Sequence, residues 1–321
     1  MLPPSGAGAG LPAGPKGEAV VGVREASMAW SFTIVDVFTE RPLAGNQLAV
    51  FANGPDIPEA LLQPLACEIS FAESVFLYPA ERGGDVRLRI FSPKTELNYA
   101  GHPVLGAAVV VGEQSGLDVV RVETGVGTTP VTLRRAGGRV VGGSMRQAVP
   151  TVTPFRHPAL LLAALGLERS TLPVEIYDNG LLNLYVGLET REAVRNLHPD
   201  PYDLVTIARD RGMPNVSINC YAGAGNAWKL RMFSPAMGVT EDPASGSAAG
   251  PLAVHLVRYG LAEPGVELDI RQGAEIGRPS VLHAVAHGHQ DRIERVEVFG
   301  GAQIVGRGEF DPDVLSVLLA G

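Results

Sequence analysis

The chain has 321 residues, which fits one large domain or two domains of ordinary size. Its 45% hydrophobic and 19% charged content is typical of a globular protein, and no run approaches the roughly 18 apolar residues of a membrane helix. The net charge of −8 gives no reason to expect nucleic acid or an anionic membrane as a partner. Two cysteines without a CxxC spacing disfavour a disulfide scaffold, and a cytoplasmic location is the simplest expectation.

The N-terminal segment lacks the pattern of a folded element. Residues 1–27 are rich in Gly, Ala and Pro and have no apolar stretch of the kind that a signal peptide needs. Met28 immediately precedes the first strand pattern. We therefore expect residues 1–30 to be a disordered tail, or an extension from a start codon placed too early.

Residues 31–150 are predicted to form a first lobe that is rich in strands. Strands are expected at 32–38, 47–51, 70–77, 86–91, 119–123, 130–134 and 139–145, with an amphipathic helix at 58–69. A second helix, at 104–111, is apolar on every side. Because such a helix must be buried all round, we expect strands to wrap it.

Prolines at 150, 154 and 158 mark a crossing into a second lobe, residues 151–301. Helices are expected at 159–167, 192–197, 203–211 and 252–259, and strands at 174–177, 182–188, 215–222 and 227–233. Short strands alternating with turns are expected after the last helix. The segment 302–321 could return to the first lobe, with 302–307 as the pairing strand.

Nearly the same peptide occurs in both halves of the chain. It reads Leu-Arg-Ile-Phe-Ser-Pro at 88–93 and Leu-Arg-Met-Phe-Ser-Pro at 230–235. Each copy leads through an acidic loop to a glycine turn, Gly101-His102 or Gly246-Ser247, and then to an apolar helix. This repetition predicts an α+β fold of two similar lobes related by a pseudo-twofold axis, each a barrel-like sheet around a central apolar helix. Ligands commonly bind between such lobes.

The two helix N-termini predict an anion site. The first N–H groups of a helix have no intrahelical partner, and the helix dipole adds positive potential there. Two N-termini facing one site would suit a carboxylate held by Gly101, Ser245, Gly246 and Ser247. His102 and Asp242 stand in the same two loops and could act on such a ligand.

These polar residues also have purely structural interpretations. His102 could satisfy backbone groups at the start of its helix, and Asp242 could cap its loop or helix. Ser245 and Ser247 could be ordinary N-caps, which is compatible with ligand binding. Glu73 could lie on a solvated strand face.

Three histidines near the end of the chain, His283, His287 and His289, have a spacing that could fit a metal. A metal site needs further ligands and an outer shell of hydrogen bonds. Solvent-exposed loop histidines are therefore the favoured interpretation.

Five stretches resemble the phenazine-biosynthesis isomerase family, which has a diaminopimelate-epimerase-type fold. They are 96–103 (Glu-Leu-Asn-Tyr-Ala-Gly-His-Pro), 175–180 (Glu-Ile-Tyr-Asp-Asn-Gly), 218–225 (Ile-Asn-Cys-Tyr-Ala-Gly-Ala-Gly), 231–251 and 275–280 (Glu-Ile-Gly-Arg-Pro-Ser). The similarity runs from about Phe32 onward. The resemblance implies a homodimer without metal or organic cofactor that isomerises trans-2,3-dihydro-3-hydroxyanthranilate to the amino-ketone precursor of phenazines.

The resemblance also assigns roles to individual residues. The family's acid/base glutamate falls on Glu73, and its histidine, aspartate and serine fall on His102, Asp242 and Ser247. Glu73 would take the C3 proton of the substrate and deliver a proton to C1. Its apolar neighbours would raise its pKa towards the working pH, which suits a group that acts as base and then acid.

The chain departs from the family pattern at two positions. Ala72 replaces the usual serine before the glutamate, which removes a hydroxyl beside the catalytic group, and Gln47 replaces the usual proline in the first hairpin. Racemases of the same fold use two thiols, one at each helix N-terminus.

The positions that match those thiols are Ala100 and Ser245, whereas Cys67 and Cys220 lie elsewhere in the sequence. Racemisation by two thiols is therefore disfavoured. Two other functions stay open: the same proton transfer on another small amino or hydroxy acid, and non-catalytic binding of a carboxylate.

Overall fold

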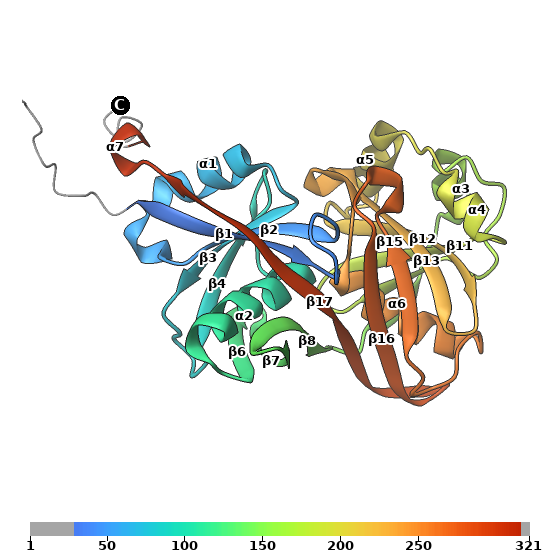
Figure 1. Cartoon of the computed structure of the whole chain (residues 1–321). Helices are drawn as coiled ribbons and strands as arrows, with labels where there is room; N and C mark the ends of the chain where they lie inside the picture. The colour runs from blue at the N-terminus through green and yellow to red at the C-terminus, as the bar shows by residue number, and fades with distance from the viewer. Residues whose placement is uncertain (1–28, 316–321) are drawn as a thin grey trace, which may run out of the picture.

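The computed structural model describes residues 29–315, so that the expected N-terminal tail lies, up to residue 28, outside the described part. Two lobes stand side by side, and one long strand, β17, runs across both (Figure 1). Within residues 29–315, no helix combines the length and the apolarity that a membrane span requires.

The first half of the chain builds most of the N-terminal lobe. Its elements are β1 (Trp30–Val37), β2 (Asn46–Phe51), the 3-10 helix η1 (Gly54–Asp56), α1 (Glu59–Ile69), β3 (Glu73–Tyr78), β4 (Val86–Phe91), β5 (Glu96–Leu97), α2 (Gly101–Ser115), β6 (Val119–Thr124), β7 (Gly127–Ala136) and β8 (Arg139–Gln147).

The second half builds most of the C-terminal lobe. Its elements are β9 (Thr151–Pro154), α3 (Pro158–Ala164), β10 (Glu175–Asp178), β11 (Leu182–Gly187), α4 (Arg191–Arg195), α5 (Pro201–Asp210), β12 (Val216–Ala224), β13 (Ala227–Ser234), η2 (Pro235–Met237), β14 (Val239–Asp242), α6 (Gly246–Arg258), β15 (Leu268–Gln272), η3 (Ala274–Ile276), β16 (Ser280–His289), β17 (Arg292–Phe310) and α7 (Pro312–Leu315).

The internal duplication is visible in the strand pairing. In the first half β2 pairs with β3 in parallel, β3 with β4 antiparallel, and β4 with β6 in parallel. In the second half β11, β12, β13 and β15 repeat these three pairings in the same order and directions. The short strands β5 and β14 each pair with the repeated peptide just before the central helix. The predicted α+β fold of two similar lobes is therefore confirmed.

Both sheets close on themselves. In the N-terminal lobe the pairing order is β1, β2, β3, β4, β6, β7, β8, β17 and back to β1, which is a closed barrel of eight strands. In the C-terminal lobe the order is β10, β11, β12, β13, β15, β16, β17 and β8, whose continuation β9 pairs with β10. The lobes therefore share β8 and β17.

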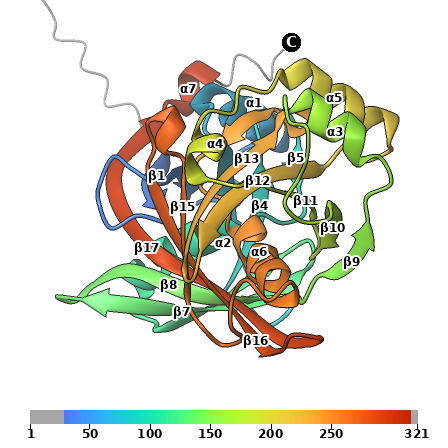
Figure 2. The same cartoon turned by 90° about the vertical axis from the view of Figure 1, so that its right-hand side faces the viewer.

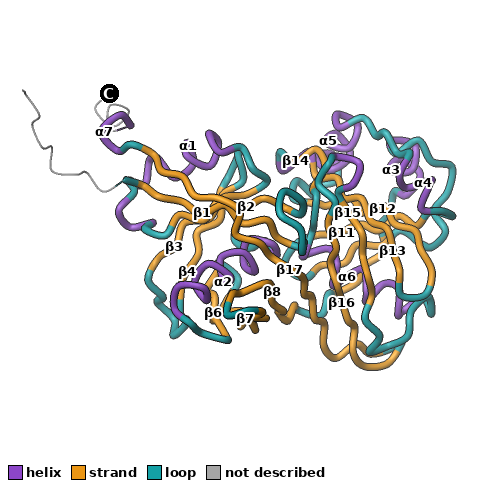
Figure 3. Tube along the Cα trace, viewed as in Figure 1, coloured by secondary structure: helices purple, strands orange, loops and turns teal. Residues whose placement is uncertain are grey.

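The central helices are buried, as their sequences require. Along α2 every residue from Gly101 to Val110 is buried, and along α6 every residue from Gly246 to Val257. A helix with no polar stripe is stable in water only if other elements cover all of it. Figures 2 and 3 show α2 and α6 inside the strands, whereas α1, α3 and α5 lie at the periphery.

The expectation of short strands and turns after α6 is wrong for β17. This strand runs unbroken through Gly300-Gly301, which resembles a turn in the sequence. The two glycines allow close approach: a Cβ at Gly300 would lie 2.6 Å from the Phe38 ring, and one at Gly301 would lie 2.5 Å from the Thr39 carbonyl oxygen. Beyond them, Ala302 to Phe310 pairs with β1 of the N-terminal lobe.

Candidate active site

The two predicted helix N-termini lie against each other at the boundary between the lobes. A Cβ added to Gly101, the first residue of α2, would lie 2.7 Å from the backbone nitrogen of Ser247 in α6. Only a glycine permits this approach, because the obstacle is backbone rather than the flexible end of a side chain. The positive ends of both helix dipoles therefore point into one region.

Neither helix has a side-chain cap at its N-terminus. Ala100 occupies the N-cap position of α2 and has no acceptor in its side chain, and Ser245 occupies that of α6 without making a cap bond. The N–H groups of Gly101, Gly246 and Ser247 also have no intrahelical acceptor, since they belong to first turns. Both N-termini can therefore donate to an anion.

Glu73 and His102 face each other beside these N-termini. Glu73 is the first residue of β3, and His102 is the second residue of α2. Oε2 of Glu73 lies 3.3 Å from Nε2 of His102. Both atoms are buried, their contact lacks the geometry of a hydrogen bond, and neither has another hydrogen-bond partner within residues 29–315. Two buried polar atoms without hydrogen-bond partners are unfavourable unless a ligand supplies those partners.

Burial shifts both groups towards their uncharged forms. The pKa of Glu73 is raised well above 4.5, first by burial and then by the negative charge of Asp242. Burial lowers the pKa of His102 to about 3, opposed by a hydrogen bond to the backbone of Gln47. A carboxylate with a raised pKa is a stronger base and, once protonated, can still return the proton near neutral pH.

Asp242 approaches the same region from the C-terminal lobe. It ends β14 and is 6% exposed. Its Oδ1 accepts a hydrogen bond from Asn46 Nδ2 at 2.7 Å, and its Oδ2 accepts one from the Ser245 hydroxyl. Burial raises the pKa of Asp242 to about 6, although the bonds from Ser245, Asn46 and the Ala244 backbone lower it. Asp242 therefore also caps its own loop, as one of the structural interpretations proposed.

Asn46 links the loop of Asp242 to the start of α2 at His102, a contact that sequence reasoning missed. Its Nδ2 lies 2.7 Å from Asp242 Oδ1, 3.0 Å from the carbonyl oxygen of Ala244 and 3.2 Å from Nδ1 of His102. In the sequence Asn46 follows a glycine, and this pair is typical of an ordinary turn. The one available signal was that a buried strand begins at a polar residue.

Gln272 was also missed. Its Oε1 accepts from the Ser245 backbone N–H at 3.1 Å, and its Nε2 donates to the Asp242 carbonyl oxygen at 2.7 Å and to Ser245 Oγ at 2.8 Å. This amide fixes the loop between Asp242 and α6. Ser245 is therefore held from both sides, and its hydroxyl is committed to Asp242 rather than to capping the helix.

The carbonyl of Ser247 has an acceptor site left free by a proline. Pro251 has no N–H, so the usual bond from residue 251 back to the Ser247 oxygen cannot form. Asn179 Nδ2 donates to this oxygen instead, at 3.0 Å, and Gln147 Nε2 donates to the Gly246 oxygen at 2.8 Å. Side chains from the end of β8 and from the loop after β10 thus hold the first turn of α6.

Glu73 does not lie on a solvated face: its side chain is 13% exposed, and its Oε2 atom is buried. The cysteines lie away from the helix N-termini, as the sequence indicated. Cys67 is exposed on α1, and Cys220 is buried in β12, where burial raises its thiol pKa to about 12.

The three histidines near the end of the chain all lie on β16, not in a loop. His283 Nδ1 contacts Glu267 at 2.9 Å, and His287 Nε2 contacts Glu297 at 3.2 Å. Across residues 29–315, no group of three or more His, Cys, Asp and Glu side chains is arranged to hold a metal ion.

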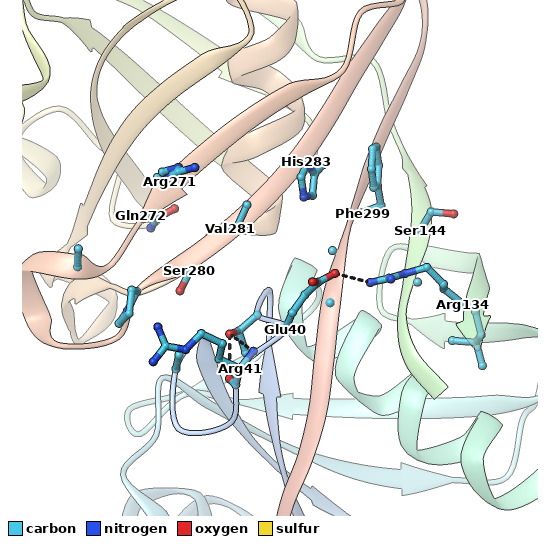
Figure 4. A pocket seen from close by; sticks show the side chains of 18 of the residues that line it. Glu40, Arg41, Arg134, Ser144, Arg271, Gln272, Ser280, Val281, His283 and Phe299 are labelled. Atoms are coloured by element: carbon cyan, nitrogen blue, oxygen red, sulfur yellow. Dashed lines mark hydrogen bonds and ion pairs between the residues drawn. The ribbon is translucent and has the colours of Figure 1, made fainter. Parts of the chain in front are cut away.

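A cavity of about 980 Å³ opens elsewhere on the lobe boundary (Figure 4). Arg41, Arg134, His283 and Phe299 are among the residues that line it. None of Glu73, His102, Asp242 and Ser247 lines this cavity. Size alone therefore does not mark this cavity as the candidate site, because the facing, unpaired atoms of Glu73 and His102 lie at the helix N-termini.

The fold, with its two facing helix N-termini, defines a class of two-lobed α+β proteins, and the named relatives of this chain show that it is an isomerase. The chain belongs to the PhzC-PhzF family of phenazine biosynthesis-like proteins, whose family model matches residues 35–308. It is 45% identical over 277 residues to the trans-2,3-dihydro-3-hydroxyanthranilate isomerase of Pseudomonas aeruginosa. The alignment covers 86% of this chain and 98% of that protein. The chain is 45% identical over 278 residues to the enzyme of the same name from Pseudomonas fluorescens, covering 87% and 98%.

A solved structure shares the fold. The Bacillus anthracis phenazine biosynthesis protein of the PhzF family aligns with a TM-score of 0.77 at 22% sequence identity, and the alignment covers 88% of this chain and 99% of that chain.

Proposed function

We propose that the protein isomerises trans-2,3-dihydro-3-hydroxyanthranilate by transferring a proton from C3 to C1 through Glu73. The observation that carries the choice of substrate is the 45% identity to isomerases named for it, over 98% of their length. The observation that supports Glu73 is its unpaired, buried Oε2 beside the two helix N-termini.

The chemistry of the substrate explains what the site must do. Its ring carries the carboxylate on C1, the amino group on C2 and the hydroxyl on C3, with double bonds C4=C5 and C6=C1. Removing the C3 proton leaves a carbanion that is conjugated through the diene to C1 and its carboxylate. Protonation at C1 then leaves C3=C4 and C5=C6, and the enol at C3 relaxes to the ketone.

A single carboxylate can perform both proton transfers. C3 and C1 are both bonded to C2, so one base on one face of the ring can reach both positions. The Glu73 carboxylate takes the C3 proton, and the resulting acid gives a proton to C1. Its raised pKa helps both steps, since a carboxyl of ordinary pKa would be a weaker base. Because Glu73 and the substrate exchange every proton of this transfer, the proposed reaction needs no cofactor.

The helix N-termini stabilise the charge that develops. As C3 loses its proton, negative charge spreads onto the substrate carboxylate. The N–H groups of Gly101, Gly246 and Ser247 and the two helix dipoles favour this charge more as it grows. His102 and Asp242 would bind the hydroxyl and amino groups, and so orient C3 towards Glu73.

The proposal is tested by adding purified protein to trans-2,3-dihydro-3-hydroxyanthranilate and following the ultraviolet absorbance. Loss of the absorbance of the conjugated diene acid is expected. In deuterated water deuterium should enter C4 of the product as the enol relaxes to the ketone, and should enter C1 only to the extent that protonated Glu73 exchanges with solvent. An unchanged spectrum with this compound would refute the assigned substrate.

A second candidate is the same proton transfer on another small amino or hydroxy acid, favoured by Ala72. This residue directly precedes Glu73 and lacks the hydroxyl that the family usually has there. Deuterium uptake by other cyclic amino acids or hydroxy acids, but not by the dihydro-hydroxyanthranilate, would support this candidate. Binding of a carboxylate without any deuterium uptake would instead indicate a non-catalytic binding protein.

A further inference from the structure

One arginine of the C-terminal lobe binds the turn that precedes Asn46 in the N-terminal lobe. Arg278 follows η3, and its Nε donates to the carbonyl oxygen of Gly45 at 2.9 Å. A terminal nitrogen of the same guanidinium donates to the Ala44 carbonyl oxygen at 2.7 Å and to Asp36 Oδ1 at 2.6 Å. All three acceptors belong to the segment that leads from β1 into β2.

The acceptors hold a turn whose backbone conformation is unfavourable by itself. Leu43 has φ 62° and Gly45 has φ 74°, and left-handed backbone is uncommon for a leucine. Asp36 Oδ2 accepts from the Leu43 N–H at 2.7 Å, and the Gly45 N–H donates to the Pro279 carbonyl oxygen at 3.1 Å. Such conformations persist only where the surroundings fix them, and Arg278 with Pro279 supplies that fixation from the other lobe.

The next residue after this turn is Asn46, whose amide contacts Asp242 and His102. No intervening residue can absorb a displacement of Gly45. We infer that Arg278 is a positioning residue for the reaction, because it sets the place of Asn46 and, through Asn46, the geometry of His102 and Asp242. This inference rests on the proposed function of the site.

The chemistry of the side chain fits this role. A guanidinium is planar and presents several donors in a fixed fork, so that it can bond one carboxylate and two neighbouring carbonyl oxygens together. A lysine ammonium would keep the charge beside Asp36, which is 1% exposed, without the fork. A positive charge beside Asp36 would therefore be enough to maintain the stability of the fold. The forked guanidinium of Arg278 is needed to place the turn at Ala44 and Gly45.

The chain offers a matched control in Arg89. Its side chain is 18% exposed, as is that of Arg278, and it also pairs with carboxylates, those of Glu59 and Glu96. These partners lie in α1 and β5 and make no described contact with Asn46. Arg89→Ala thus removes an arginine of equal exposure from its carboxylate partners, which are exposed whereas Asp36 is buried, without disturbing the turn.

The test compares Arg278→Ala, Arg278→Lys, Asn46→Ala, the double variant Arg278→Ala/Asn46→Ala, and Arg89→Ala. We expect kcat to fall about 10²-fold in Arg278→Ala and in Asn46→Ala, since misplaced catalytic groups lose rates of that order. KM should change less, and the double variant should be no slower than Asn46→Ala. Arg278→Lys should recover thermal stability but not kcat. If the kcat losses of Arg278→Ala and Asn46→Ala multiply in the double variant, the inference is wrong. It is also wrong if Arg89→Ala loses as much kcat as Arg278→Ala.

Arg278→Ala leaves the buried Asp36 without its cation, which alone can prevent folding. Arg278→Ala/Asp36→Asn removes both charges and keeps an acceptor for the Leu43 N–H. Guanidinium ion added to either variant should restore part of kcat, because Ala44 and Pro279 line the open cavity of Figure 4 and give access to the vacated place. No recovery in a folded variant would count against the role of the fork.

A measurement without substrate separates this inference from the proposed function. The ring ¹⁵N chemical shifts of His102 report the environment of both nitrogens, and Arg278→Ala should change them in the same way as Asn46→Ala. Matching shifts in an enzyme that does not turn over the dihydro-hydroxyanthranilate would refute the proposed function alone. An active enzyme whose His102 shifts are unchanged in Arg278→Ala would refute the positioning role alone.

Discussion

Nε2 of His102 and Oε2 of Glu73 lie 3.3 Å apart, buried, and unbonded to any other group of residues 29–315. The carboxyl of Glu73 can exchange a proton, and the ring nitrogen of His102 can form a hydrogen bond. A substrate can supply the partners that both atoms lack. The pair joins the first residue of a strand to the second residue of a helix. Its separation therefore depends on how β3 packs beside α2, and the predictions below follow from that geometry.

Glu73→Gln is expected to abolish turnover while the fold stays intact. Glutamine keeps the size of the side chain but cannot accept the C3 proton, and general acid–base groups contribute about 10²–10⁴-fold or more to rate. His102→Ala and Asp242→Ala should each lose less than Glu73→Gln, on the order of 10²–10⁴-fold. Steady-state kinetics with circular dichroism as the fold control measures this, and substantial activity in Glu73→Gln would rule out Glu73 as the base.

The same substitution should make the protein more stable at alkaline pH. The folded pKa of Glu73 lies above its unfolded value, so the folded state binds more protons than the unfolded state between pH 4.5 and the raised pKa. Stability is therefore lost as pH rises through this window. Glutamine resembles the protonated form and avoids the loss, which should raise the Tm by ~2 °C or more at pH 8.

At pH 4, below the window, the Tm of Glu73→Gln should match that of the wild type. Glu68→Gln, on the exposed surface of α1, controls for the removal of one carboxylate. A Tm difference between Glu73→Gln and wild type that does not change with pH would contradict the explanation.

Asp242→Asn should move the acid limb of the kcat/KM profile to lower pH. The negative charge of Asp242 raises the pKa of Glu73, so its removal lowers that pKa and keeps the base ionised in more acidic solution. Burial is the larger cause of the raised pKa of Glu73 and is unchanged in Asp242→Asn. The acid limb of the profile should therefore stay above pH 4.5. A pH–rate profile of both proteins decides this, and a limb that moves to higher pH would exclude the proposed coupling.

Gly101→Ala should separate the two helix N-termini. The added methyl group would lie 2.7 Å from the Ser247 backbone nitrogen, and backbone cannot turn aside as a side chain can. We expect kcat/KM to fall about 10²-fold as the anion site loses its geometry. Gly106→Ala, on the same helix, is the control, because the nearest atoms that its added methyl group would meet belong to the side chains of Leu48 and Val37. Equal effects of the two substitutions would mean that the loss reflects packing of α2 in general.

The sequence predicts the fold well wherever a pattern is local or repeated. The peptide ending in Ser92-Pro93 and its copy ending in Ser234-Pro235 predict the two lobes, and the apolar run after Gly101 predicts a wrapped central helix, because both signals are carried by residues adjacent in the chain. The unbroken path of β17 was missed, since Gly300-Gly301 has the composition of a turn and only its close contact with Phe38 explains the glycines.

The candidate site was predictable only in part for the same physical reason. The helix N-termini and Asp242 stand within the repeated motif, so spacing alone indicates them. Asn46 contacts Asp242 across the lobe boundary, and Gln272 reaches from the end of β15 to the loop before α6. No short-range pattern records either contact. Glu73 was found through family resemblance rather than periodicity, because a glutamate in a strand is usually solvated.

The exchange of strands between the lobes has a consequence for how the chain reaches this structure. β9, which follows the first repeat, pairs in the C-terminal lobe, and the end of β17 completes the N-terminal barrel beside β1. Neither half of the chain can therefore be excised as an autonomous domain. The N-terminal barrel cannot close until residues 302–310 have been synthesised, so its folding waits on contacts of very large sequence separation, which form slowly. The two repeats are interlocked, and the ancestral unit of the duplication would have needed a second copy of itself to close its sheet.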